Sequence, residues 1–240
     1  MAKALPKNVH ISRHPCLRAK LSQLRDQSIS GRETRALIHE ISLILGCEAT
    51  AACLSVAEDS EDMKTHLDQA YIKQTISPKT ISIVPILRSG LGMLEAIQTI
   101  LPHAVSVHHL GLCRETTTLQ PVEYYSNLSF NVPPTSNHRG AQSAEQNNIK
   151  TTSLAILLDP MIAMGRTCTA AIRMLKVWGA QKIIIISLLG AREGIERVAK
   201  EWEEGVEIWL AGMDEYVNEY GVIIPGLGDV GDRLFLTAGS

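Results

Sequence analysis

The stretch SLAILLDPMIAMGRTCTAAIRMLKVWG, residues 153–179, decides the fold expected of this chain. A continuous apolar run ends at Asp159, a short loop with one glycine follows, and Thr167 opens a helix that Gly179 ends. A strand that is apolar along its whole length is buried on both faces, which is typical of a parallel sheet covered by helices. The stretch therefore predicts a strand, a loop and a helix of an α/β protein.

The same alternation of strand and helix occurs on both sides of this stretch. Before it we expect a strand, a turn into a helix and a second strand, at residues 80–87, 88–101 and 104–112. After it we expect a strand, a helix and a further strand, at residues 182–190, 194–205 and 206–212. This order predicts a mainly parallel twisted sheet flanked by helices.

Three further segments complete the expected organisation. SGRE, Ser30 to Glu33, is a capping box that predicts a helix, with Gly46 as its end. Residues 57–79 are polar and weakly patterned, and we expect a protruding hairpin arm or a loop there. Residues 131–150 are rich in Pro, Ser, Asn and Gln, which predicts a mobile surface loop. The length of 240 residues fits one domain, residues 1–240.

Composition excludes several classes of function. The net charge is −2, so no global positive field attracts nucleic acid or an anionic membrane. The five cysteines form no CxxC pair, which argues against zinc and for reduced thiols in a cytosol-like compartment. No apolar run approaches the roughly 20 residues of a membrane span, and the N-terminus lacks the apolar core of a signal peptide. We therefore expect a cytoplasmic protein.

Two strand-to-helix loops carry groups suited to an anionic ligand. Asp159 at a strand tip can accept hydrogen bonds from two vicinal ribose hydroxyls, and the N–H groups near Gly165 to Thr167 open a helix, where a phosphate is stabilised. The alternative is that Asp159 only makes a turn and that Thr167 only caps the helix. In LRSGLG, residues 87–92, Arg88 can bind an anion through two N–H groups, or it is simply a solvated or salt-bridged residue.

A third loop, PGLGDVGD at residues 225–232, contains a GxGxxG pattern. The pattern marks a dinucleotide site only where a helix and a second strand follow. Too few residues remain after Gly231 for these elements, so the dinucleotide interpretation fails. We instead expect an irregular loop that surrounds a small ligand with backbone groups.

Together these loops resemble the uracil phosphoribosyltransferase family. The resemblance covers most of the chain and depends on a series of motifs in a fixed order: LRDQSIS (24–30), CEAT (47–50), VPILRSGLGM (84–93), RETTTLQPVEY (114–124), LDPMIAMGRT (158–167), REGIE (192–196) and NEYGVIIPGLGDVGDR (218–233). It implies the phosphoribosyltransferase type I fold, with a C-terminal base-binding loop. It also implies transfer of a phosphoribosyl group from phosphoribosyl pyrophosphate (PRPP) to uracil, giving UMP and pyrophosphate in pyrimidine salvage.

The resemblance also assigns roles to individual residues. Arg88 and Arg114 would contact the pyrophosphate, and Asp229 would face PRPP, with Arg88 and Asp229 as the catalytic pair. Backbone at Ile223, Gly228 and Val230 would read the uracil edge beside Asp229. The remaining PRPP contacts would come from one continuous loop: Asp159, Pro160, Met161, Ile162, Ala163, Met164, Gly165, Arg166 and Thr167. Mg²⁺ would be bound through pyrophosphate without direct protein ligands, GTP is an activator of some relatives, and a homodimer or higher homo-oligomer is expected.

The chain departs from the family pattern after Arg114, where Glu115, Thr116 and Thr117 stand in place of the usual acids, and at Ser89, where alanine is common. Three further positions also depart from it. Met164 stands where a threonine hydroxyl helps to hold the phosphate, Arg166 where a glycine is expected, and Val222 where a tyrosine is usual. Loss of a charge-assisted hydrogen bond costs on the order of 1.5 to 3 kcal/mol. An alternative therefore stays open: a phosphoribosyltransferase-fold paralogue with altered or lost catalysis that binds a nucleotide or a partner.

Overall fold

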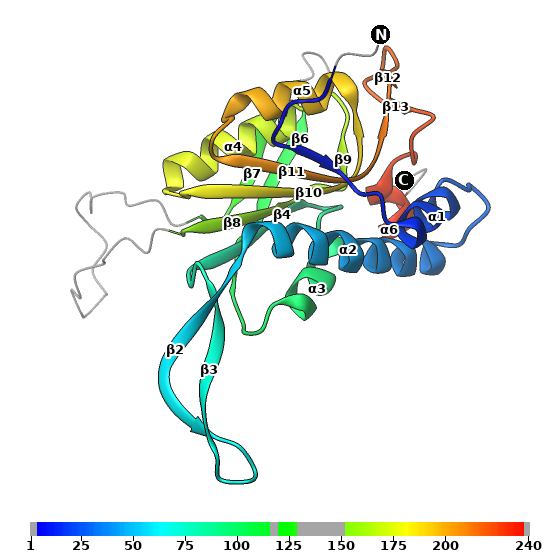
Figure 1. The fold of residues 1–240 in the computed structure, drawn as a ribbon. Helices are drawn as coiled ribbons and strands as arrows, with labels where there is room; N and C mark the ends of the chain where they lie inside the picture. The colour runs from blue at the N-terminus through cyan, green and yellow to red at the C-terminus, as the bar shows by residue number, and fades with distance from the viewer. Residues whose placement is uncertain (1–3, 116–119, 129–151, 238–240) are drawn as a thin grey trace, which may run out of the picture.

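A mainly parallel β-sheet forms the centre of the structure, a computed structural model that describes residues 4–115, 120–128 and 152–237 (Figure 1). Its strands follow the spatial order β1 (Val9–Ile11), β11 (Val206–Asp214), β10 (Lys182–Ala191), β8 (Leu154–Leu158), β4 (Ile81–Leu87), β6 (Leu110–Arg114) and β7 (Pro121–Ser126). Two short strands join it, β5 (Ser106–Val107) beside β4 and β9 (Met161–Ile162) beside β10. The β6–β7 pair is antiparallel and all other pairs in this sheet are parallel, which confirms the predicted fold class.

Helices cover both faces of this sheet (Figure 1). One face packs on α2 (Gly31–Cys53) and α3 (Leu91–Ile100), and the other packs on α4 (Arg166–Trp178) and α5 (Arg192–Glu201). Side chains of β8 alternate between the two cores, with Ile156 in the first and Leu157 in the second. Burial on both faces explains why the strand sequences are apolar without interruption.

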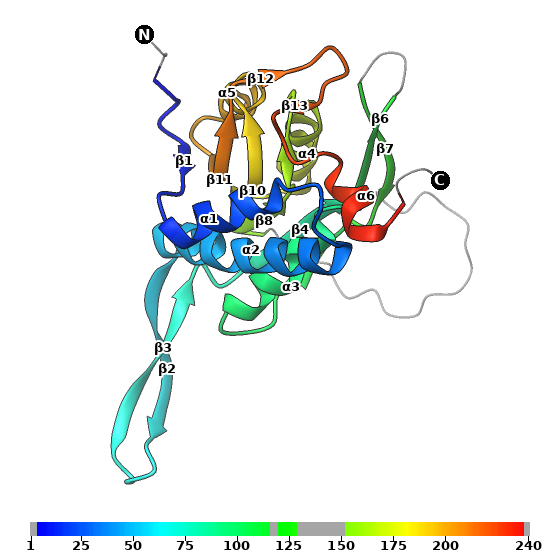
Figure 2. The same cartoon turned by 90° about the vertical axis from the view of Figure 1, so that its right-hand side faces the viewer.

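Two further helices, α1 (Pro15–Leu24) and α6 (Val230–Phe235), pack on the α2 side of the sheet (Figure 2). The sequence interpretation did not predict α1. Its buried face consists of three leucines, Leu17, Leu21 and Leu24, in an otherwise polar segment. Three leucines on one face give only a weak helical pattern in the sequence. The structure shows that this face is covered by α2 and the sheet.

The predicted start of α2 is confirmed and its predicted end is wrong. Ser30 and Glu33 form both hydrogen bonds of the capping box. The helix continues through Gly46 to Cys53, because Gly46 is a packing position and not a cap. A Cβ at Gly46 would come within 2.6 Å of Ile97 Cδ1 and 2.8 Å of Ile100 Cδ1, so glycine lets α3 approach α2.

The predicted strand at residues 104–112 is also corrected, since it is divided into β5 and β6. Both pieces pair with β4, at Ile83 and at Ile86. Pro85 lies between the two paired stretches and has no N–H to donate, which accounts for the interruption.

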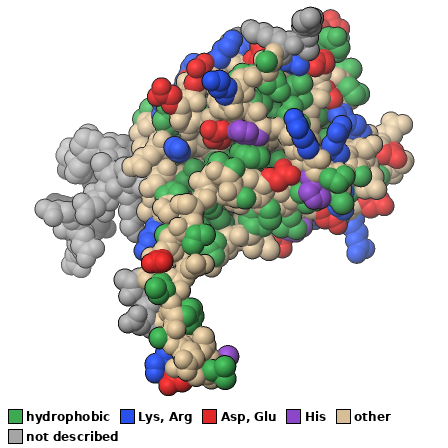
Figure 3. Space-filling model, in the orientation of Figure 1, with side chains coloured by type: hydrophobic (Ala, Val, Ile, Leu, Met, Phe, Trp, Pro, Cys, Tyr) green, Lys and Arg blue, Asp and Glu red, His purple; other side chains and the backbone are tan. Residues whose placement is uncertain are grey.

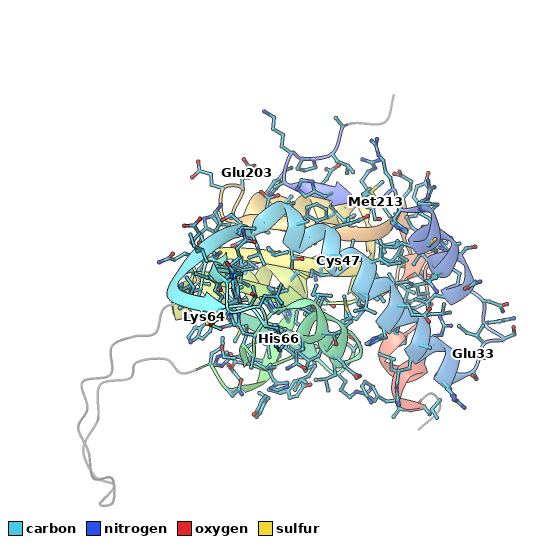
Figure 4. The ribbon with its side chains drawn as sticks, turned by 60° about the horizontal axis from the view of Figure 1, so that its bottom comes forward. Glu33, Cys47, Lys64, His66, Glu203 and Met213 are labelled. Carbon is cyan, nitrogen blue, oxygen red and sulfur yellow. The ribbon has the colours of Figure 1, made fainter. Side chains whose placement is uncertain are left out.

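The segment predicted as an arm is a two-stranded hairpin, β2 (Ser55–Lys64) and β3 (Ala70–Ser77), that projects from the body (Figures 1 and 3). Figure 4 turns the arm toward the viewer, with Lys64 and His66 near its tip. A second small hairpin, β12 (Tyr216–Val217) and β13 (Ile223–Ile224), follows β11. The loop predicted at residues 131–150 lies outside the described residues.

Among the described residues, α2 alone is long and apolar enough to cross a membrane by length and composition. The sequence analysis expected no apolar segment long enough to span a membrane, whereas α2 has the length and composition of one. Ile38, Ile41 and Leu45 of α2 are fully buried in the core beneath the sheet, so α2 has the packing of a core helix.

Candidate functional site

A cleft of about 390 Å³ lies at the carboxyl edge of the parallel strands. Strands β10 and β11 run toward this edge, where the β12–β13 hairpin lies (Figure 2). Three segments far apart in the sequence line the cleft: the end of β4, the loop after β8, and the chain from Gly221 to Gly231. Parallel strands place the loops that follow them at one edge, so a shared site is the expected result.

The loop after β8 carries a carboxylate and the start of a long helix. Asp159 is 7% exposed at the strand tip and lines the cleft together with Met161, Ala163 and Thr167. Arg166 and Thr167 lie in the first turn of α4, and the N–H groups at the start of a helix favour an anion. All nine residues from Asp159 to Thr167 that the sequence grouped belong to this one strand–loop–helix connection.

Close packing against α5 fixes the shape of this loop. Gly165 has a φ of 75°, and a Cβ there would lie 2.5 Å from the carbonyl oxygen of Gly194 at the start of α5. Arg197 of α5 donates to the carbonyl oxygen of Met164 and also pairs with Glu193 at 2.9 Å. The sequence reasoning missed both contacts, because Gly194 and Arg197 belong to a helix that follows in the chain.

Cys168 is a second residue that the sequence reasoning missed as part of the site. It was assigned only to the apolar face of the helix, yet its thiol donates to Oδ2 of Asp159 at 3.1 Å. Burial, followed by the nearby Asp159 charge, raises the pKa of Cys168 well above the ordinary thiol value, so the thiol stays protonated.

Arg88 lies at the margin of the cleft. Its neighbours Leu87 and Ser89 line the cleft, whereas its side chain is 53% exposed and pairs with Asp232 Oδ1 at 3.3 Å. It also donates to Thr237 Oγ1 at 3.2 Å. The structure thus joins Arg88 to the C-terminal helix α6. Arg114 ends β6, and its side chain lies outside what the structure describes.

The C-terminal loop brings its predicted residues together. Ile223, Gly228, Asp229 and Val230 all line the cleft, and Gly228 has a φ of 70°. Asp229 caps α6 by accepting a hydrogen bond from the Asp232 N–H at 3.0 Å. The six-residue helix α6 begins within the GxGxxG pattern, at Val230, and no strand follows it among the described residues.

A buried ion pair holds this loop on the sheet. Arg25 donates to both carboxylate oxygens of Asp214, at 2.8 and 2.9 Å, and to the carbonyl oxygen of Gly226 at 2.9 Å. The Gly226 N–H in turn donates to Asp214 at 3.0 Å. Arg233 adds bonds to the carbonyl oxygens of Leu24 and Leu227. Because Arg25 and Asp214 are 189 residues apart, no local pattern reveals this pair.

Three of the departures from the family pattern fall on these loops. Val222 lines the cleft and is 42% exposed, Arg166 begins α4, and Met164 offers its carbonyl oxygen to Arg197. Among the described residues, no group of three or more His, Cys, Asp or Glu side chains is placed to hold a metal ion.

Fold and cleft define an α/β protein that presents a phosphate-type loop, a carboxylate and a glycine-rich loop to one ligand site, as expected of a phosphoribosyltransferase. A family model described as uracil phosphoribosyltransferase matches residues 11–237. The chain belongs to the uracil phosphoribosyltransferase family, a family of glycosyltransferase enzymes.

Individual relatives extend over nearly the whole chain. A uracil phosphoribosyltransferase of Thermoanaerobacter sp. (strain X514) is 38% identical, covering 96% of this chain and 99% of its own. One from Finegoldia magna is 39% identical, with coverage of 93% and 96%. A solved Aquifex aeolicus structure aligns with a TM-score of 0.80 and 29% identity, covering 97% of this chain and all of that chain. The predicted family, fold class and enzyme class are confirmed.

Proposed function

We propose that this protein transfers the phosphoribosyl group of PRPP to uracil, forming UMP and pyrophosphate. The observation that carries the proposal is the shared cleft, in which the loop after β8 and the glycine-rich C-terminal loop face the same space. An activated ribose and a base must meet in one orientation, and lining one cleft with both loops provides the required proximity.

The loop after β8 would hold the ribose 5-phosphate. Asp159 accepts the two ribose hydroxyls, and backbone N–H groups at Gly165 to Thr167 donate to the phosphate at the start of α4. The close contact of Gly165 with Gly194 of α5 fixes the course of the loop, because a Cβ at Gly165 would not fit there.

The other residues would act on the leaving group and the base. N1 of uracil forms a bond to C1 of the ribose, the C1–O bond breaks with its electron pair on pyrophosphate, and the N1 proton is lost. Arg88 and Arg114 stabilise the charge that develops on pyrophosphate, while Asp229 faces the PRPP ribose. Backbone groups of Ile223, Gly228 and Val230 bind the uracil edge.

In this proposal Arg88 exchanges partners during binding. Its present partner, Asp232 of α6, has a side chain that is 33% exposed, and the Arg88 side chain is 53% exposed. An exposed pair of this kind is worth only about 0–1 kcal/mol. Pyrophosphate, with several charged oxygens, is a stronger acceptor and would displace the Asp232 carboxylate.

Mg²⁺ is proposed to be held by the substrate, without direct protein ligands. Mg²⁺ bound to pyrophosphate oxygens would neutralise part of the leaving-group charge. GTP as an activator is tested by adding it to the turnover assay, where a raised kcat or a lowered KM supports the role.

A second candidate is a paralogue that binds a nucleotide without this reaction. The observation in its favour is that Met164, Arg166 and Val222 alter the phosphate loop and the cleft while the core pattern remains. The test is formation of UMP from uracil and PRPP, with Mg²⁺ present and absent and with cytosine, hypoxanthine and adenine as control bases. Formation of UMP from uracil and PRPP, with no nucleotide formed from the three control bases, supports the proposal. Nucleotide binding without product favours the paralogue.

Three broader proposals accompany this function. We propose that the chain forms one domain, that it acts in the cytoplasm, and that it assembles into a homodimer or larger homo-oligomer. Exposed apolar side chains on the arm support self-association, since Val56, Leu67 and Ile72 are 69%, 82% and 59% exposed. Light scattering of the purified protein measures the assembly, and a monomeric mass argues against it.

A further inference from the structure

Cys168 lies in the first turn of α4, and its side chain is 1% exposed. Its Sγ is 3.1 Å from Oδ2 of Asp159. The helix around it is rigidly placed, because Ala171, Ile172 and Leu175 on the same face are fully buried against the sheet. The thiol is therefore a fixed donor directed at one carboxylate oxygen.

Asp159 connects this buried thiol with the open cleft. Its backbone N–H donates to the carbonyl oxygen of Ile186 on β10 at 3.3 Å, so the main chain is fixed at the strand tip. Among the described residues that line the cleft, Asp159 is present and Cys168 is not. Both residues line the small hollow inside the loop between β8 and α4. Asp159 thus belongs both to the hollow that contains the thiol and to the open cleft.

A second contact on this carboxylate is longer. The Met161 N–H reaches Oδ1 of Asp159 at 3.5 Å, at the outer limit of a hydrogen bond. An ionised carboxylate offers about four acceptor positions, so one carboxylate can accept hydrogen bonds from several donors at once. A protonated thiol is a weak donor in water, but a buried bond to a charged acceptor is stronger than a neutral exposed one.

We propose that Cys168 is a positioning residue for the phosphoribosyl site: its S–H group holds the Asp159 carboxylate in the orientation that accepts the vicinal ribose hydroxyls. This inference rests on the ribose-binding role proposed above for Asp159. Cys168 itself touches neither the substrate nor the reacting atoms. Its effect on ligand binding passes through one carboxylate.

The test compares two nucleotides that differ only in the hydroxyls concerned, UMP and 2′,3′-dideoxy-UMP. Calorimetric Kd values are measured for the wild-type protein, Cys168→Ala, which removes the donor, and Cys168→Ser, which keeps a donor on a shorter bond. Ile172→Val is the matched control, because it removes one buried methyl group from the same helix without a contact to Asp159. Thermal unfolding of each variant is recorded alongside.

We expect Cys168→Ala to weaken UMP binding about three- to tenfold, less than the full loss of a hydrogen bond to a charged group, because the thiol acts on the ligand only through Asp159. Binding of the dideoxy nucleotide should change by less than about twofold, since it does not use the hydroxyl contacts. Cys168→Ser should restore UMP binding to within about twofold of the wild type, and Ile172→Val should leave the preference for UMP unchanged.

Three results would overturn the inference. Cys168→Ala with unchanged UMP binding would show that the thiol does not position the carboxylate. Equal weakening for both nucleotides, without rescue by serine, would show that Cys168 acts only in packing. A wild-type protein that binds both nucleotides equally would remove the ribose role of Asp159 itself, and this failure of the proposed function is recognised before any variant is made.

Discussion

The ion pair between Arg25 and Asp214 offers a quantitative test of how the base-binding loop is held. Asp214→Ala removes two charge-assisted hydrogen bonds from Arg25, at 2.8 and 2.9 Å, and the bond from the Gly226 N–H at 3.0 Å. The Asp214 side chain is only 8% exposed, so the hydrogen bonds that it accepts are largely shielded from water. The variant therefore loosens the chain segment that is proposed to read uracil.

The expected cost follows from the exposure of the two partners. Removing one member of a buried pair costs about 3–5 kcal/mol. The Arg25 side chain is 28% exposed and regains some hydration when Asp214 is absent, which places the loss near the lower end, at about 3 kcal/mol. For a protein of this length each kcal/mol shifts Tm by about 2–4 °C, so Tm should fall by about 6–12 °C.

Differential scanning calorimetry measures this shift, and the KM for uracil is expected to rise in the same variant. The matched control is Lys64→Ala, which breaks an exposed pair with Asp68 on the arm, whose side chains are 65% and 80% exposed. That change should move Tm by no more than about 2 °C. An Asp214→Ala protein with the same Tm as this control would refute the reasoning.

Three further results are expected. Arg88→Ala should abolish turnover while leaving Tm nearly unchanged, because its side chain is 53% exposed and an ion pair as exposed as that with Asp232 contributes little to stability; global unfolding by circular dichroism would instead show a structural role. Met164→Thr combined with Arg166→Gly should lower the Kd for PRPP, and an unchanged or higher Kd in calorimetry would count against the loop assignment. The pKa of buried Cys168 is raised, so the folded state binds the thiol proton more strongly than the unfolded state does. The protonated thiol therefore contributes its full stabilisation below the ordinary thiol pKa of about 8.5, and this contribution is lost as pH rises toward the pKa of the thiol in the folded state. Denaturant titrations from pH 7 to 10 should therefore show a steeper loss of stability in the wild type than in Cys168→Ala; parallel curves would contradict this.

The sequence predicted those parts of the fold that depend on local patterns. The apolar strands and the caps at Ser30 and Gly179 are set by neighbouring residues, and apart from the divided strand at residues 104–112 they lie where the patterns predicted. Gly46 was assigned wrongly, because a glycine that ends a helix and one that admits another helix look alike until the partner is known. The three-leucine face of α1 was missed for the same reason.

The site was predictable only as far as its loops. Motifs grouped Asp159 to Thr167 and Ile223 to Val230, and the strand order brings both groups to one cleft. The sequence did not reveal the supporting contacts: the Cys168 thiol with Asp159, Arg197 with the carbonyl oxygen of Met164, and the ion pair of Arg25 with Asp214. These contacts depend on side-chain directions and on approaches between distant segments, which no local pattern records.

A crystal structure of the protein with bound UMP tests most directly whether one cleft holds both the ribose phosphate and the base. The expected result places the phosphate at the backbone of Gly165 to Thr167, the ribose hydroxyls on the Asp159 carboxylate, and the uracil against Gly228. A nucleotide bound elsewhere, or with its base turned away from the C-terminal loop, would contradict the proposed site.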